Sequence, residues 1–213
     1  MNKYIEGKNL SDEELWNWCL NEYKSSNFII KYLINNFYKC IKNISELFEP
    51  DFKILEVGCG AAESSDRIRN IIGDLHFEIS DYDERYVNLI IKKKPHFKNY
   101  VEVESIYNLK RKDNEFDCIF VLEVLEHLDN YKLALEEVFR VSRKYVVISV
   151  PNEPMWRVLN MLRLRYINNF GNTPGHINHF NSKILNCELT KFGDVLRIYK
   201  PIPWLIALVK VKK

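Results

Sequence analysis

The sequence predicts an α/β fold: a three-layer sandwich around a doubly wound, mostly parallel sheet of seven strands that ends in an antiparallel hairpin. Short, almost continuously apolar segments alternate with amphipathic helical segments from Phe52 onward, an order typical of a parallel sheet covered by helices on both faces. A glycine turn follows the first apolar segment. The last two strand-like segments, 195–199 and 205–211, are separated by too few residues for a helical crossover, so they should pair antiparallel.

Length and composition indicate one globular domain of 213 residues. The 31 Lys and Arg nearly balance the 29 Asp and Glu, and a net charge of +2 gives no overall field that would attract nucleic acid. The five cysteines include no C-x-x-C pair, which favours a reduced, cytoplasmic protein over a zinc ribbon or a disulfide framework. Residues 1–12 are too polar for a signal peptide, and the longest apolar run, 204–209, is too short to span a membrane. The oligomeric state stays open.

The sequence predicts that residues 1–50 form an N-terminal helical cap and that residues 51–213 form the main domain. Ser11 and Glu14 have the spacing of a capping box, so one helix should begin near Ser11. Apolar residues then recur at helical spacing from Ile30 to Phe48, until Pro50 ends the pattern. We expect these helices to cover an edge of the sheet or to line a substrate pocket.

The sheet and its helices are expected in alternation. The predicted strands are 52–57, 75–79, 101–104, 116–122 and 145–150, and the helices are 62–72, the segment after Asp83 up to Lys94, 131–141 and 183–192. Lysines 92–94 have a simple explanation, because cations at a helix C-terminus complement its dipole. In such folds ligands bind beyond the carboxyl ends of the strands.

Residues 152–182 interrupt this alternation and are predicted to be an insertion that acts as a lid. An apolar and basic segment, 155–165, precedes the loop 171–180. Long loops at the functional face of a fold are usually lids or binding loops.

Several motifs lie at the predicted carboxyl ends of the strands. Glu56-Val57-Gly58-Cys59-Gly60 resembles the first motif of class I S-adenosylmethionine (SAM) dependent methyltransferases, of the type 11/12-like group. Asp81, Ser105–Leu109, Phe116–Leu128 and the closing hairpin stand at the spacings of that family. The resemblance covers roughly Phe52 to the C-terminus, and it implies a SAM-dependent methyltransferase.

The resemblance also implies a cofactor site. Gly58 and Gly60 would let the backbone approach the methionine part of SAM, and Glu56 would bind its ammonium group. Asp81 would accept hydrogen bonds from both ribose hydroxyls, unless it is a helix N-cap, a role that suits Asp83 better. The remaining cofactor contacts assigned by the resemblance are Cys59, Tyr82, Ser105, Ile106, Leu122 and Glu123.

Two positions depart from the family pattern. Ser105 stands where an aspartate usually receives the adenine amino group, so backbone groups and the packing of Ile106 would carry more of the recognition. Glu104 would take this role if the register moved by one residue. Ala62 replaces the third glycine of the first motif.

Methyl transfer is a direct displacement, in which the protein aligns the acceptor and excludes water. A base is needed when the acceptor loses a proton. His127, just past the fourth strand, is the first candidate, although a histidine packed at a helix start would look the same. Tyr107, His176 and His179 are further candidates, and the two loop histidines could equally order the loop.

The expected function is methyl transfer to a small molecule, and three alternatives stay open. Glu123, Glu126 and His127, with His176 or His179, resemble the metal site of small-RNA 3′-terminal 2′-O-methyltransferases. The same Glu-Val-Leu-Glu-His-Leu segment also occurs in enzymes for small molecules, so no metal ligand is assigned. A nicotinamide dehydrogenase would place its third glycine at Glu63, a poor substitute. A degenerate relative would serve as a scaffold, with or without bound SAM.

Overall fold

A computed structural model describes residues 10–20 and 27–212. In this part of the chain, seven strands form one sheet in the order β3-β2-β1-β4-β5-β7-β6. Strands β1 to β5 pair parallel, whereas β7 runs antiparallel to both β5 and β6. The strands are β1 (Lys53–Val57), β2 (His76–Asp81), β3 (Val101–Val103), β4 (Phe116–Leu122), β5 (Ser142–Pro151), β6 (Gly193–Tyr199) and β7 (Trp204–Val211). The predicted doubly wound sheet with a closing hairpin is confirmed.

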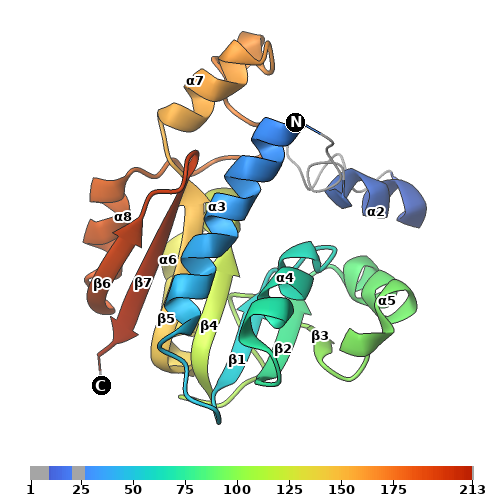
Figure 1. Ribbon diagram of the computed structural model, residues 1–213, viewed down its shortest axis with the longest axis vertical. Coiled ribbons are helices and arrows are strands. Elements are labelled where there is room, and N and C mark those ends of the chain that lie inside the picture. The colour runs from blue at the N-terminus through green and yellow to red at the C-terminus, as the bar shows by residue number, and fades with distance from the viewer. Residues whose placement is uncertain (1–9, 21–26, 213) are drawn as a thin grey trace.

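Helices cover both faces of the sheet (Figure 1). The helices are α2 (Asp12–Leu20), α3 (Phe28–Ser45), α4 (Glu63–Ile72), α5 (Glu84–Lys93), α6 (Tyr131–Val141), α7 (Met155–Leu162) and α8 (Ser182–Leu189), and the 3-10 turns are η1 (Pro95–Phe97), η2 (Leu125–His127) and η3 (Ile167–Asn169). Buried side chains of α3, α4 and α5 form one core with one face of the sheet, and those of α6 and α8 form a second core with the other.

Alternation within the strands produces these two cores. In β1, Ile54 points into the core under α3 and α4, whereas Leu55 and Val57 point into the core under α6 and α8. Every residue of β4 is buried, as expected for a central strand covered on both faces. The continuous apolar runs in the sequence therefore follow from burial on two sides.

The N-terminal helices pack on the same core as the sheet. Ser11 and Glu14 exchange the hydrogen bonds of a capping box, with Ser11 N 2.9 Å from Glu14 Oε2. In α3, Phe37, Ile41 and Ile44 are buried against sheet residues. The division into a cap at 1–50 and a domain at 51–213 stays a prediction, because these helices share the main core.

Residues 152–182, the predicted insertion, include α7, which stands above the carboxyl end of β5 at one end of the molecule (Figure 1), whereas Phe180 packs into the core. A bridge between Asn152 and Phe180 closes the base of this insertion. Within the described residues, no helix has both the length and the apolar character needed to cross a membrane.

Candidate active site

The turn between β1 and α4 depends on glycine. Gly58 and Gly60 have φ angles of +79° and +55°, which glycine adopts without steric cost. The amides of Gly58 and Cys59 both donate to the carbonyl of Ser80, at 2.8 and 3.0 Å. A Cβ added at Gly58 would lie 2.6 Å from Val124 Cγ2, whereas one added at Gly60 would meet nothing within 4 Å. The turn is thus packed tightly at Gly58 and borders open space at Gly60.

Asp81 lies beside this turn at the end of β2. Its Oδ2 accepts a hydrogen bond from Gly60 N at 2.8 Å, and its Oδ1 accepts one from Asp83 N at 3.0 Å. Burial raises the pKa of Asp81 to about 6 because the charged form loses water. Asp83, rather than Asp81, caps α5 by accepting from Arg85 N at 3.0 Å. Asp81 is therefore held in position by the turn.

Glu56 is buried at the end of β1, and its side chain points toward α4. Its Oε2 accepts a hydrogen bond from Ser65 Oγ at 2.5 Å. Burial raises the pKa of Glu56 to about 7. A cation bound nearby would favour the ionised carboxylate and would lower this pKa.

The contacts of Lys94 were not predicted, because its position at the end of α5 suggested only an interaction with the helix dipole. It is buried, and its Nζ donates to the carbonyl of Ala62 at 2.9 Å, to Glu63 at 2.8 Å and to Asp66 at 2.6 Å. Lys94 thus fixes the first turn of α4 directly behind the glycine turn. Only the fold brings residues so distant in the sequence together.

The segment after β3 holds the residues that were predicted to lie near adenine. Ser105 is exposed, and its Oγ accepts from Tyr107 N at 3.3 Å. Glu104 is buried and its carboxylate pairs with Arg111 at 3.1 Å, so the structure engages Glu104 elsewhere. Ile106 is buried in the core. Tyr82, beside Asp81, is 52% exposed and can cover a ligand from the solvent side.

The end of β4 supplies the next predicted residues. Leu122 is buried, and the register pairs its neighbour Val121 with Val57 of β1, so Leu122 lies next to Gly58. Glu123 has a φ of 56°, and its Oε1 accepts from Ser149 Oγ at 2.7 Å. The strained backbone at Glu123 turns the chain into η2.

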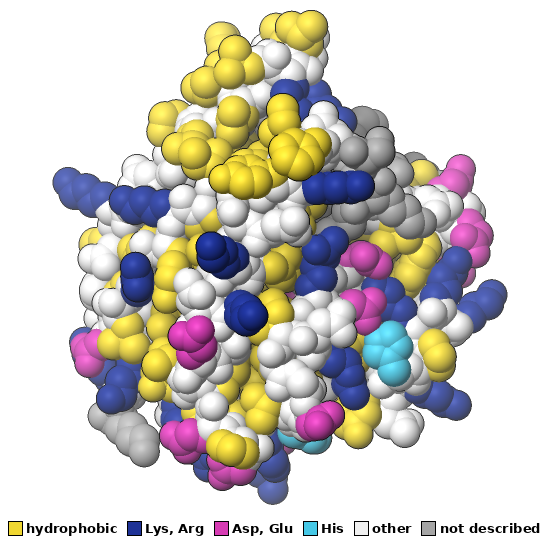
Figure 2. All heavy atoms as spheres, in the orientation of Figure 1, with side chains coloured by type: hydrophobic (Ala, Val, Ile, Leu, Met, Phe, Trp, Pro, Cys, Tyr) yellow, Lys and Arg dark blue, Asp and Glu magenta, His cyan; other side chains and the backbone are white. Residues whose placement is uncertain are grey.

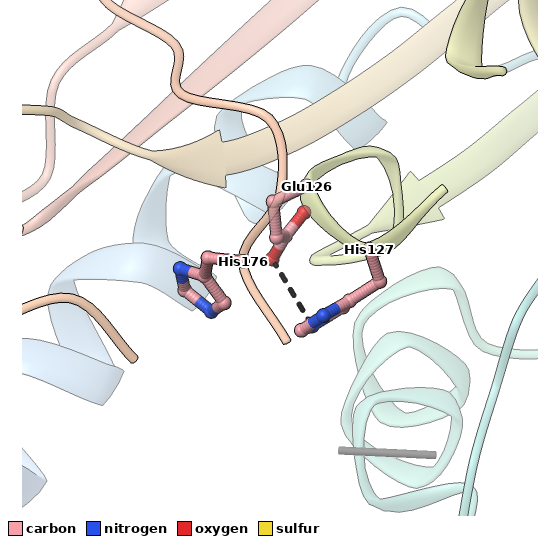
Figure 3. Close-up of side chains that lie close together, drawn as sticks. All are labelled: Glu126, His127 and His176. Carbon is pink, nitrogen blue, oxygen red and sulfur yellow. Dashed lines mark ion pairs between the residues drawn. The ribbon is translucent and has the colours of Figure 1, made fainter. Parts of the chain in front are cut away.

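Three side chains meet above this edge of the sheet: Glu126 and His127 from η2, and His176 from the loop (Figure 3). One ligand atom of each lies within 4.8 Å of the others, and all three residues are buried. His127 Nε2 is 3.8 Å from Glu126 Oε1. The rings of His127 and His176 are 5.0 Å apart between centroids. We call these residues the Glu-His-His cluster.

Hydrogen bonds join the loop 171–180 to η2 and hold the cluster together. The amides of Ile177 and Asn178 donate to the carbonyl of Glu126, at 2.9 and 3.1 Å. Asn178 Nδ2 donates to the carbonyls of Leu125 and Leu128. Because these bonds satisfy the ends of a 3-10 turn, the loop is a fixed part of the site.

The other candidate residues lie outside the cluster. His179 Nε2 is 2.8 Å from Arg157 Nη2, and its pKa is lowered by burial and by that guanidinium. The hydroxyl of Tyr107 accepts from Asn130 N at 3.4 Å. The ring of Trp156 is tilted against that of His176, with ring centroids 5.9 Å apart, and this contact was not predicted.

These residues fit the predicted cofactor. The sheet order places β1 between β2 and β4, so the chain reverses its winding at β1 and β4, and ligands of doubly wound folds bind at that point. The open space at Gly60 adjoins the buried Asp81 carboxylate, which can bind vicinal hydroxyls. Glu56 supplies a second carboxylate.

In a comparison with known protein families, residues 32–194 match the family described as a methyltransferase domain. Comparison with curated proteins finds no relative by sequence.

Solved structures share the fold at low sequence identity. Magnesium protoporphyrin IX methyltransferase from Synechocystis PCC 6803 with bound SAH is 13% identical, with a TM-score of 0.70, over 99% of this chain and 100% of that one. A SAM-dependent methyltransferase from Aquifex aeolicus is 19% identical, with a TM-score of 0.62, over 80% and 89% of the two chains. The [4+2]-cyclase SpnF is 14% identical, with a TM-score of 0.55, over 75% of this chain and 58% of that one. Its name shows that this fold also supports other reactions.

Proposed function

The chain belongs to the methyltransferase-domain family of class I SAM-dependent methyltransferases, and on that premise we propose that it transfers a methyl group from SAM to a small-molecule acceptor. The acceptor would lie between the cofactor and the insertion 152–182. The observation that carries the proposal is the Asp81 carboxylate bonded to Gly60 N beside open space. This geometry presents a carboxylate and a bare backbone to one ligand.

Bound SAM supplies an electrophilic methyl group, and the chain positions it. Asp81 accepts hydrogen bonds from the ribose hydroxyls with the lone pairs that Gly60 and Asp83 leave available. Glu56 attracts the ammonium of the methionine part, directly or through water. Tyr82 and Ile106 limit the space for adenine, and Leu122 limits it near the sulfur.

His127 is proposed as the general base. Its Nδ1 is 2.9 Å from the carbonyl oxygen of Gly175. A carbonyl only accepts, so Nδ1 carries the hydrogen and Nε2 is the atom that takes up a proton. Glu126, with Oε1 3.8 Å from Nε2, stabilises the cation that forms. An acceptor hydroxyl or amine beside Nε2 would lose its proton as the methyl group is transferred.

Replacing Asp81 tests the cofactor site. We expect Asp81→Asn to weaken SAM binding about 10- to 100-fold, because a charged hydrogen bond contributes about 1.5–3 kcal/mol. Isothermal titration calorimetry with SAM and SAH measures the change without knowledge of the acceptor.

Asp83→Asn is the matched control, since it alters a neighbouring carboxylate that caps α5. It should leave SAM affinity within about twofold. Unchanged affinity in Asp81→Asn, with wild-type thermal stability, would contradict the proposed site.

The Glu-His-His cluster supports a second candidate, a metal-dependent 2′-O-methyltransferase acting on the 3′ end of small RNA. His127 Nδ1 is hydrogen-bonded to the Gly175 carbonyl, which leaves Nε2 without the ring hydrogen. Histidines that bind metals are commonly oriented by such a bond from the other ring nitrogen. Glu126 and His176 offer two further ligand atoms at short range. Glu123 is instead bonded to Ser149 and His179 to Arg157, so the cluster offers three ligands where the sequence pattern suggested four.

Metal titration separates the two candidates. The metal-dependent candidate predicts one Zn²⁺ or Mn²⁺ ion per chain, measured by calorimetry and elemental analysis. Binding should disappear in His176→Ala and persist in the control His179→Ala. If neither ion binds stoichiometrically, the RNA candidate is excluded and His127 keeps its role as a base.

A further inference from the structure

The insertion exposes an apolar surface that the proposed function does not use. Leu162, Leu164 and Phe170 are 75%, 79% and 78% exposed. Figure 2 shows hydrophobic side chains gathered at the end of the molecule that α7 occupies. The apolar surface comprises Val158, Met161, Leu162, Leu164, Tyr166, Ile167 and Phe170. Isolated exposed apolar residues are common, but a contiguous group of this kind marks an interaction site.

Helix α7 carries its polar groups inward. Asn160 is buried, and its Nδ2 donates to the carbonyl of Gly171 at 2.9 Å and to Thr173 Oγ1 at 3.2 Å. Trp156 Nε1 also donates to Thr173, at 2.8 Å. Val158, Met161 and Leu162 occupy the outward positions. A helix whose outer face meets water has the opposite arrangement, so the outer face of α7 suits an apolar surrounding.

The beginning of α3 also exposes apolar side chains at this end of the molecule. Phe28, Ile29 and Tyr32 are 80%, 65% and 57% exposed. Both α7 and the N-terminal end of α3 lie at the top of Figure 1, although they are far apart in the sequence. Two separate segments therefore expose apolar side chains at the same end.

The charged side chains of α3 and of the segment between Glu153 and Glu188 are all basic. The sequence has no Asp or Glu between Glu153 and Glu188, and α3 has none either. Arg163, Arg165 and Lys31 are exposed, and within residues 10–20 and 27–212 no carboxylate forms an ion pair with them. The apolar surface is thus bordered by unpaired cations.

We propose that this end of the molecule docks on the surface of an anionic phospholipid bilayer. The apolar side chains of α7 and of the segment to Phe170 enter the boundary between headgroups and acyl chains, and Arg163 and Arg165 meet lipid phosphates. Amphipathic segments with apolar and basic residues bind membranes in the plane of the interface, and the eight residues of α7 are too few to cross a bilayer.

The charges argue against other occupants. A second copy of the chain would bring like-charged surfaces together, which is unfavourable. Nucleic acid would leave Leu162, Leu164 and Phe170 without an apolar partner. A lipid interface satisfies both features at once.

Vesicle sedimentation with the full chain tests the proposal. We expect binding to vesicles of phosphatidylcholine with phosphatidylglycerol, weaker binding to phosphatidylcholine alone, and a decrease at high salt. Arg163→Gln with Arg165→Gln should lower the partition coefficient on anionic vesicles about 10- to 30-fold. Leu164→Asp with Phe170→Asp should lower it at least as much.

Leu196→Asp is the matched control, because Leu196 lies on β6 and is 49% exposed. It should bind vesicles like the wild type, and circular dichroism should report an unchanged fold for every variant. Failure to bind anionic vesicles overturns the proposal, as does binding that the double aspartate variant leaves intact. Sedimentation equilibrium that finds a dimer abolished by this variant, without vesicle binding, assigns the surface to a second copy.

Discussion

Glu56 and Asp81 are carboxyl groups buried at the ends of neighbouring strands. Burial raises the pKa of Glu56 to about 7 and that of Asp81 to about 6. Between about pH 4 and pH 7 the native state therefore binds more protons than the unfolded state, so these groups contribute less to stability as pH rises. Burial thus favours the protonated form of both carboxyls, and the proposed binding of a cation and of hydroxyl donors would favour the ionised form.

Glu56→Gln should remove the free-energy cost of burying one of these ionised carboxylates. Without SAM, the variant should be more stable than the wild type at pH 8 by on the order of 3 kcal/mol, and the difference should vanish near pH 4, where Glu56 is protonated in both states. Urea unfolding at pH 4, 6 and 8 measures it.

Glu137→Gln is a control of opposite sign. The guanidinium of Arg140 lowers the pKa of Glu137, so this variant should lose stability at pH 8 and lose less as pH falls. If Glu56→Gln shows no gain at pH 8, burial does not penalise the Glu56 carboxylate as we argue.

At the scale of elements, the link from β1 to α4 is tightly packed at one glycine and borders open space at the other. Gly58 sits against Val124 of the segment after β4, and Gly60 borders free space next to Asp81. Lys94 fixes the helix start through Ala62, Glu63 and Asp66. The link is therefore packed tightly at Gly58 and open at Gly60, next to Asp81.

Alanine at the two glycines should separate folding from binding. Gly58→Ala combines a positive φ with a 2.6 Å contact to Val124, and we expect it to cost more than about 2 kcal/mol of unfolding free energy. Gly60→Ala should cost only about 1 kcal/mol from its φ, yet weaken SAM binding at least tenfold because its Cβ enters the ligand space. Chemical denaturation and calorimetry give the two quantities. Wild-type SAM affinity in Gly60→Ala would show that the ligand does not approach this backbone.

At the scale of the whole molecule, the proposed functions lie at the carboxyl ends of the strands and in residues 152–182 above them. The carboxyl ends of β1, β2 and β4 supply the glycine turn, Asp81 and the segment to His127. The insertion supplies His176 and Trp156 toward the sheet and apolar side chains toward the outside. Vesicle binding would therefore place the site near a lipid surface, and the test of that docking needs no knowledge of the acceptor.

Much of the fold was determined by local sequence. Gly58 and Gly60, the Ser11 capping box and the continuous apolar strands each leave a signal within a few residues. The structure confirms the sheet, the closing hairpin and most element bounds within a few residues. Asp81 could be predicted as a ribose-binding residue because the end of a strand and the distance from the glycine turn are both visible in the sequence.

Only the tertiary structure decided which distant residues meet. Lys94, at the end of α5, reaches the carbonyl of Ala62 before α4. His176 joins Glu126 and His127 because backbone bonds attach its loop to η2. The same is true of the outward face of α7, because the sequence predicted an apolar and basic lid segment without showing which of its residues face outward. Local patterns record backbone preference and periodic burial, whereas contacts between segments depend on packing that no short stretch of sequence encodes.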